Sequence, residues 1–226
     1  MLAKLRSNSN TGSNFLRLNT CVTQIAQDPD LPKTGPVEVT SQTHGGASHT
    51  STYAHVITTT TLPSLRSMNL DHARLTPSQS TALRELQYGA AAKVGVKFLT
   101  AWWEVDDPDS GLAPKFGPIK GGISYTDRMA RMVVYPSHGL DSGAKSTVLI
   151  SAYGWTNDAL QLSSLFGEDS KERLKDLICR DLVAVHGLHP ERGLAFLKDQ
   201  WVDAFTFSWT TALNTMGVFS LGFCFG

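Results

Sequence analysis

The sequence predicts an α+β fold in which an antiparallel or mixed sheet is flanked by helices. Runs of alternating and β-branched residues recur along the chain, two segments carry helical spacing, and no regular βαβ alternation is present. The composition, with 41% hydrophobic and 9% aromatic residues, is that of a folded protein. A chain of 226 residues is long enough to build one sizeable core.

Strands are expected in several short stretches. Residues 18–25 and 37–43 predict strands on either side of a turn, and residues 44–52, rich in Gly, Ser, Thr and His, predict a loop. Residues 53–62 are β-branched and predict a buried strand that ends before Pro63. Further strands are expected at residues 92–98 (extended by Trp102 and Trp103), 129–135 and 147–153, with a loop at residues 105–122.

Two helices have clear start signals. Thr76 and Gln79 match a capping box with Pro77 at the first helical position, which predicts a helix to about Leu86. Asp169 and Glu172 match a second capping box. The helix that follows carries one apolar face made of Leu174, Leu177, Ile178, Leu182 and Val185, and it should end at Gly187. A shorter helix is expected after Pro190.

Charge and cysteine content limit the classes of function. The 20 basic and 20 acidic residues balance, which argues against a dedicated nucleic-acid binder. No apolar run is long enough to predict a membrane span. The three cysteines are far apart, which favours a reducing compartment such as the cytoplasm over secretion, although the compartment stays open.

Familiar phosphate, metal and nucleophile motifs are absent from the sequence. It contains no GxGxxG, no GxxxxGK[ST] and no GxSxG, and its Gly121-Gly122 pair falls in a predicted loop. The neighbouring residues His44, His49 and His55 lack the spacing of a zinc site, so surface histidines and no metal are expected. Cys21 and Cys179 fall inside predicted elements and are expected to be buried structural thiols.

Lys93 is the most informative single residue. It lies in a segment that otherwise suits an interior strand, where an ammonium group is costly unless it meets a partner or a wet site. Two interpretations remain open at this point. Lys93 either serves a functional site or extends its side chain into water from the edge of the sheet.

Four stretches, in their order and spacing, resemble the flavin-containing amine oxidase family, and most of all its L-amino-acid oxidase branch. They are residues 54–62 (AHVITTTTL), 82–98 (ALRELQYGAAAKVGVKF), 131–136 (RMVVYP) and 148–155 (VLISAYGW). Residues 209–219, with Thr215-Met216-Gly217, resemble the stretch that precedes the last flavin-binding motif of that family. The resemblance covers about residues 18–219.

The resemblance implies an FAD-dependent oxidation of a primary amine or an L-amino acid to an imine, which water hydrolyses, with molecular oxygen reduced to hydrogen peroxide. Lys93 matches the family lysine that holds a water against the flavin. Tyr153 matches the residue whose phenol binds the substrate carboxylate, and Trp155, on the same side of its strand, would line the side-chain pocket. Val22 matches a valine whose backbone meets the adenine ring.

The departures from the family are as informative as the matches. The family's N-terminal GxGxxG and its final flavin-contacting motif have no counterpart here. The expected organisation is therefore a polar leader at residues 1–18, partial FAD-domain strands at 19–62 and a truncated substrate domain at 63–226. Such a fragment is expected to lack the FAD-binding Rossmann half and to be inactive alone.

Two alternatives to an oxidase fragment remain open, together with the oligomeric state. One is a non-catalytic amino-acid-binding or regulatory module that keeps the substrate-domain fold. The other is an unrelated structural domain, which would leave Lys93 far from Tyr153. A homo-oligomer is compatible with the sequence but is not indicated by any motif.

Overall fold

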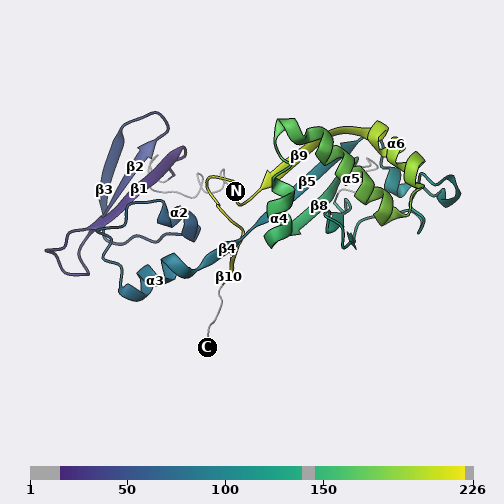
Figure 1. The fold of residues 1–226 in the computed structure, drawn as a ribbon. Helices are drawn as coiled ribbons and strands as arrows, with labels where there is room; N and C mark the ends of the chain where they lie inside the picture. The colour runs from purple at the N-terminus through teal and green to yellow at the C-terminus, as the bar shows by residue number, and fades with distance from the viewer. Residues whose placement is uncertain (1–15, 139–145, 222–226) are drawn as a thin grey trace. The chain divides into compact units, whose positions relative to one another are not determined.

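A computed structural model describes residues 16–138 and 146–221 of the chain (Figure 1). The chain divides into two compact units, of which unit 1 ends at Gln87 and unit 2 begins at Tyr88. The boundary expected from sequence, between residues 62 and 63, lies inside unit 1. Between the strands expected at residues 129–135 and 147–153, residues 139–145 lie outside the described residues.

Unit 1 contains a three-stranded antiparallel sheet of order β1-β2-β3. Its strands are β1 (Thr20–Gln27), β2 (Val37–Thr43) and β3 (Ser48–Tyr53). The first two agree with the predicted strands. No strand pairs with the outer edge of β1, but residues 69–72 run along it. The Ile25 N–H donates to the Asn69 carbonyl at 3.1 Å, and the Gln27 N–H donates to the His72 carbonyl at 2.8 Å.

The expected strand at residues 53–62 is wrong, and so is the expected loop up to residue 52. The strand is β3 and ends at Tyr53, while no strand is formed by residues 54–62, where Ile57 is 90% exposed. A β-branched run forms a strand only where a neighbouring strand accepts its hydrogen bonds. Pro63 does not end a strand but lies in the first turn of α2 (Leu62–Arg66), where its missing N–H costs nothing.

The first predicted helix is confirmed as α3 (Pro77–Glu85), with both halves of the capping box between Thr76 and Gln79 in place. Its last turn is held by Arg66, whose guanidinium donates to the Leu86 carbonyl at 3.0 Å. No residue of α3 is buried.

Unit 2 is built on a five-stranded sheet of order β6-β7-β8-β5-β9, in which every neighbouring pair is antiparallel. The strands are β5 (Ala91–Phe98), β6 (Ile123–Tyr125), β7 (Met132–Val134), β8 (Val148–Trp155) and β9 (Trp201–Ser208). A separate two-stranded ribbon pairs β4 (Gln87–Gly89) with β10 (Phe219–Leu221). The α+β prediction is thus confirmed, with an antiparallel sheet.

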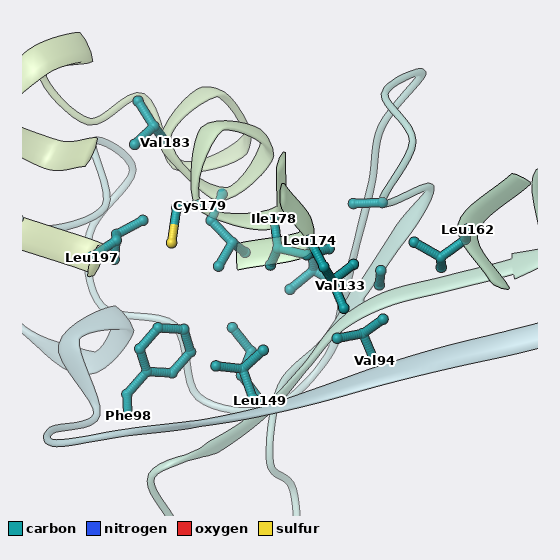
Figure 2. Close-up of a cluster of buried hydrophobic side chains, with 14 of the residues drawn as sticks. Val94, Phe98, Val133, Leu149, Leu162, Leu174, Ile178, Cys179, Val183 and Leu197 are labelled. Carbon is teal, nitrogen blue, oxygen red and sulfur yellow. The ribbon is translucent and has the colours of Figure 1, made fainter. Parts of the chain in front are cut away.

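Three helices cover one face of this sheet: α4 (Thr156–Ser163), α5 (Lys171–His186) and α6 (Pro190–Gln200). Figure 2 shows the core between the two layers, where Val94, Phe98 and Leu149 of the sheet face Ile178 and Leu197 of the helices. These five side chains are at most 1% exposed. All buried apolar residues among those described lie at position 90 or later, so this is the only core that the structure describes.

Two local predictions in unit 2 are wrong. Trp102 and Trp103 do not extend β5 but form a buried 3-10 turn (Trp102–Glu104), because their rings meet Phe98 edge to face at 5.9 and 6.0 Å. The helix predicted to start at Asp169 starts at Lys171, after a 3-10 turn, with no side-chain cap from Ser170. Its predicted end at Gly187 is confirmed, with φ +65°.

Candidate active site

Lys93 lies on the face of the sheet that the helices leave open. Side chains alternate along β5, so Ala92, Val94 and Val96 point into the helix-covered core and are fully buried. Lys93 and Lys97 then point to the opposite face. Because β5 lies between β8 and β9, the alternative of a lysine at the sheet edge is wrong.

The register places two aromatic residues directly beside Lys93. Its Cα partners are Tyr153 on β8 and Phe207 on β9. Since Trp209 N–H donates to the Ala91 carbonyl, β5 residues of odd number direct their backbone groups toward β9. Lys93 and Tyr153 are therefore a non-hydrogen-bonded pair, the kind in which opposite side chains approach most closely.

The Lys93 ammonium is held between two aromatic rings. Its Nζ lies 4.4 Å from the centroid of Tyr153 and 4.9 Å from that of Trp209. Each such contact contributes about 0.5–2 kcal/mol, more where water is excluded. The strand that carries Lys93 is paired on both sides and buried on its other face, so both the backbone and the two rings constrain the position of the ammonium.

Four aromatic side chains form a continuous group around the Lys93 ammonium. We call Lys93 and these four residues the aromatic face: Lys93, Tyr153, Trp155, Phe207 and Trp209. Tyr153 contacts Trp155 at 4.9 Å between centroids, and Phe207 contacts Trp209 at 4.8 Å. Trp155 is 42% exposed, so its ring presents a wide apolar surface to whatever occupies this side of the sheet.

The turn after β9 locks Trp209 in place. Its carbonyl accepts the Gly217 N–H at 2.9 Å and the Thr215 hydroxyl at 2.8 Å. Gly217 has φ +139° and no room for a side chain, because a Cβ there would lie 2.4 Å from the Cβ of Tyr88. The residues 215–217 that suggested the family resemblance thus serve to fix this tryptophan.

The structure brings Lys93, Tyr153 and Trp155 together as neighbours. Val22 belongs to β1 of unit 1, beside a bulge between Val22 and Gln24, and so is described apart from the aromatic face. Phe207 and Trp209 were not singled out from the sequence. The signal that identifies them is the period-two spacing of Phe205, Phe207 and Trp209, which places all three on one side of a strand.

The cysteines and histidines that the structure describes form no metal site. Within residues 16–138 and 146–221, no three His, Cys, Asp or Glu side chains come together as metal ligands. Cys179 is buried as predicted, and burial raises the pKa of its thiol to about 12. The prediction for Cys21 is wrong: it is exposed, because the described part of unit 1 has no apolar core to cover it.

The aromatic face suits the planar ring system of a flavin, since it offers flat apolar surfaces and one fixed cation on an open sheet. The usual binding site for the diphosphate of a dinucleotide is a glycine-rich strand-to-helix turn, which this sequence does not contain. The residues present therefore fit the reactive end of the cofactor and not its phosphate end.

Comparison with known proteins shows the family to which the chain belongs. Residues 2–221 match the family model described as flavin containing amine oxidoreductase. The chain belongs to this family, and membership implies a flavin cofactor. L-amino-acid oxidase 4 of Hebeloma cylindrosporum is 39% identical over 212 residues, which are 92% of this chain and 32% of that protein. The L-amino-acid oxidase of Bothrops pauloensis is 30% identical over 187 residues, 83% of this chain and 32% of its own length.

The chain thus spans about a third of the length of these two relatives. Among solved structures, a putrescine oxidase redesigned in its cofactor binding has a similar fold, with a TM-score of 0.62 and 15% identity. That likeness covers 89% of this chain and 37% of the other. The described residues include no helix long and apolar enough to cross a membrane.

Proposed function

We propose that the chain supplies the substrate side of an FAD-dependent oxidase that converts a primary amine, most of all an L-amino acid, to its imine. Hydrolysis of the imine gives the keto acid, and molecular oxygen is reduced to hydrogen peroxide. The observation that carries the proposal is the Lys93 ammonium between Tyr153 and Trp209 on the open face of the sheet. The L-amino-acid oxidases among the relatives support the amino-acid substrate.

When bound, FAD supplies the hydride acceptor for the substrate carbon and passes the electrons to oxygen. The chain's own residues orient the other participants. The Lys93 ammonium donates hydrogen bonds to a water, which it holds in the reacting position. The Tyr153 phenol donates to the substrate carboxylate, a charge-assisted bond that is stronger where water is excluded. Trp155 contacts the apolar part of the substrate side chain.

The remaining assignments belong to the same proposal. Residues 19–62 contribute strands to the flavin-binding side, with the Val22 backbone against the adenine ring, and residues 63–226 form the substrate domain. The sequence lacks a diphosphate-binding turn, so we expect the 226-residue chain alone to bind no FAD tightly and to be inactive. Titration with FAD, followed by flavin fluorescence, checks this expectation; stoichiometric tight binding would contradict it.

A chimera tests the reaction itself. Residues 20–221 would replace the matching segment of the Hebeloma oxidase, and hydrogen peroxide release would be measured with a panel of L-amino acids and with simple primary amines. Oxidation of L-amino acids by the chimera supports the proposal. A chimera that folds and binds flavin but oxidises no amine would refute it, and flavin-free amino-acid binding by the original chain would favour the non-catalytic module instead.

A further inference from the structure

A pocket of about 520 Å³ lies within unit 1, between residues 66–75 and one face of α3. Ser80, Leu83 and Arg84 line it from the helix, at positions i, i+3 and i+4, which share one face. All of its lining residues belong to unit 1, whereas the aromatic face belongs to unit 2. The proposed oxidation therefore assigns no role to this pocket.

One part of the lining is apolar. It consists of Met68, Leu70, Leu75 and Leu83, each of which is half-buried. Since the described part of unit 1 has no fully buried apolar side chain, these four keep some of their surface in contact with water. A ligand that covers them removes that apolar surface from water, which favours binding.

The charged part of the lining is mostly cationic. It contains Arg66, Arg74 and Arg84, against Asp71 as the one acidic residue of the lining. Arg84 forms an exposed ion pair with its neighbour Glu85 at 3.2 Å. With that pair counted as neutral, two arginines stand against one aspartate, so the pocket keeps a net positive charge.

Two of these arginines are held by backbone carbonyls and not by carboxylates. The Arg66 guanidinium donates to the Leu86 carbonyl at 3.0 Å. Arg74, whose backbone is left-handed with φ +51°, donates through Nη1 to the Leu31 carbonyl at 2.6 Å. Neither arginine forms an ion pair with any described residue. Because a carbonyl is neutral, both guanidiniums are positioned while keeping their full charge, with further N–H groups to donate.

We propose that this pocket binds an organic carboxylate whose anionic group is attached to an apolar aryl or alkyl body. The carboxylate accepts N–H groups from Arg66 and Arg74, whose planar guanidiniums match its geometry. The body of the ligand covers the four apolar residues of the lining. A single negative charge balances the net charge of the pocket, whereas a dianionic phosphate would be repelled more strongly by Asp71.

Titration of the 226-residue chain with hydrocinnamate, followed by amide chemical shifts, measures this binding. We expect saturable shifts at residues 66–84, with a Kd of about 1 mM or below. Added salt should weaken the binding, because the arginines are partly exposed. Hydrocinnamyl alcohol, which has the same body without the charge, should bind much more weakly, and so should inorganic phosphate, which has no apolar body.

Two substitutions test the charges without disturbing the fold. Arg84→Gln removes a cation whose one ion pair is exposed, and it should weaken hydrocinnamate binding about two- to fivefold. Asp71→Asn removes the carboxylate that opposes the ligand and should strengthen binding by a similar factor. Arg173→Gln, at an exposed arginine of α5, is the matched control and should leave the Kd unchanged.

The proposal needs no flavin and no turnover, so this test is independent of the proposed oxidation. Absence of shifts at residues 66–84 overturns the proposal, as do shifts confined to the aromatic face. Equal binding of hydrocinnamyl alcohol or of inorganic phosphate contradicts it, because one of the two halves of the ligand would then be irrelevant. A Kd that neither Arg84→Gln nor Asp71→Asn alters contradicts it as well.

Discussion

His186 is a buried titratable residue whose protonation state follows from its partners. It is 1% exposed, with Nδ1 2.7 Å from the Leu182 carbonyl and Nε2 2.7 Å from the Tyr135 hydroxyl. A carbonyl only accepts, so Nδ1 carries the proton and Nε2 accepts from Tyr135. The hydroxyl of Ser124, 2.9 Å away, then donates to Tyr135. Because the ring is buried, desolvation penalises the charged imidazolium and favours the neutral imidazole.

The burial of His186 predicts that the folded protein is sensitive to acid. Burial lowers the pKa of His186 to about 4, below its usual 6.5, whereas the bond to Leu182 acts in the opposite direction. Between pH 6.5 and pH 4 the unfolded chain therefore binds a proton at this histidine while the folded chain does not. The contribution of neutral His186 to the free energy of unfolding is complete above pH 6.5 and is lost as the pH falls toward 4. The loss amounts to roughly 3 kcal/mol. Urea unfolding at pH 7.5 and 4.5 measures it, and His186→Gln should flatten this pH dependence.

Tyr153 carries a prediction about substrate binding. In the chimera, Tyr153→Phe keeps the ring beneath Lys93 and removes only the phenolic hydroxyl, so KM for an L-amino acid should rise about tenfold or more. The KM for a primary amine without a carboxylate should stay unchanged. Tyr125→Phe, at an exposed tyrosine of β6, is the control. An equal change in KM for both substrates would show that Tyr153 does not bind the substrate carboxylate.

At the scale of elements, Gly193 of α6 is required by close packing and not by backbone conformation. A Cβ at this position would lie 2.7 Å from the Cβ of Leu188. Alanine favours a helix by about 1 kcal/mol over glycine, but the clash involves an atom that cannot rotate away. We therefore expect Gly193→Ala to lower the melting temperature. Gly167→Ala, where nothing lies within 4 Å, should not; equal stability of both variants would show that α6 shifts freely.

Elements whose signals are local could be predicted from sequence. The capping box of α3, the glycine end of α5 and the alternation of β5 depend on residues a few positions apart, and each is found. Elements that depend on distant partners could not. The threonine-rich run at residues 54–62 lacks a neighbouring strand among the described residues. Trp102 leaves the strand direction, and its ring meets not only Phe98 nearby but also His186, far along the chain, at 4.7 Å between centroids.

The candidate site divides in the same way. Lys93 stands out because a charged residue interrupts an apolar strand, and Tyr153 and Trp155 follow from the resemblance. Trp209 could not be identified without the register, since its contact with Lys93 depends on β9 lying beside β5. The open side of the sheet was also beyond prediction, because it depends on all three helices crossing the same face.

At the scale of the whole molecule, the two units differ in what holds them together. Unit 2 encloses the core of Figure 2, whereas the described part of unit 1 has no buried apolar side chain. Hydrogen bonds without a core allow local opening at low cost. Amide hydrogen exchange should therefore be fast in β1 to β3 and slow in β5 and β8. Equal protection of the amides from exchange in both units would contradict this, and would show that the strands of unit 1 are shielded from water in solution.

The central claim is that the Lys93 ammonium serves the reacting centre of a flavin-dependent amine oxidase. Stopped-flow reoxidation of the reduced chimera by oxygen tests it most directly. Lys93→Met should slow reoxidation by about 100-fold or more, which is the rate loss typical of removing one group that stabilises charge in a transition state. Lys97→Met, four residues along the same face of β5, should leave the rate unchanged. Equal rates in the two variants, with flavin content and fold preserved, would contradict the account.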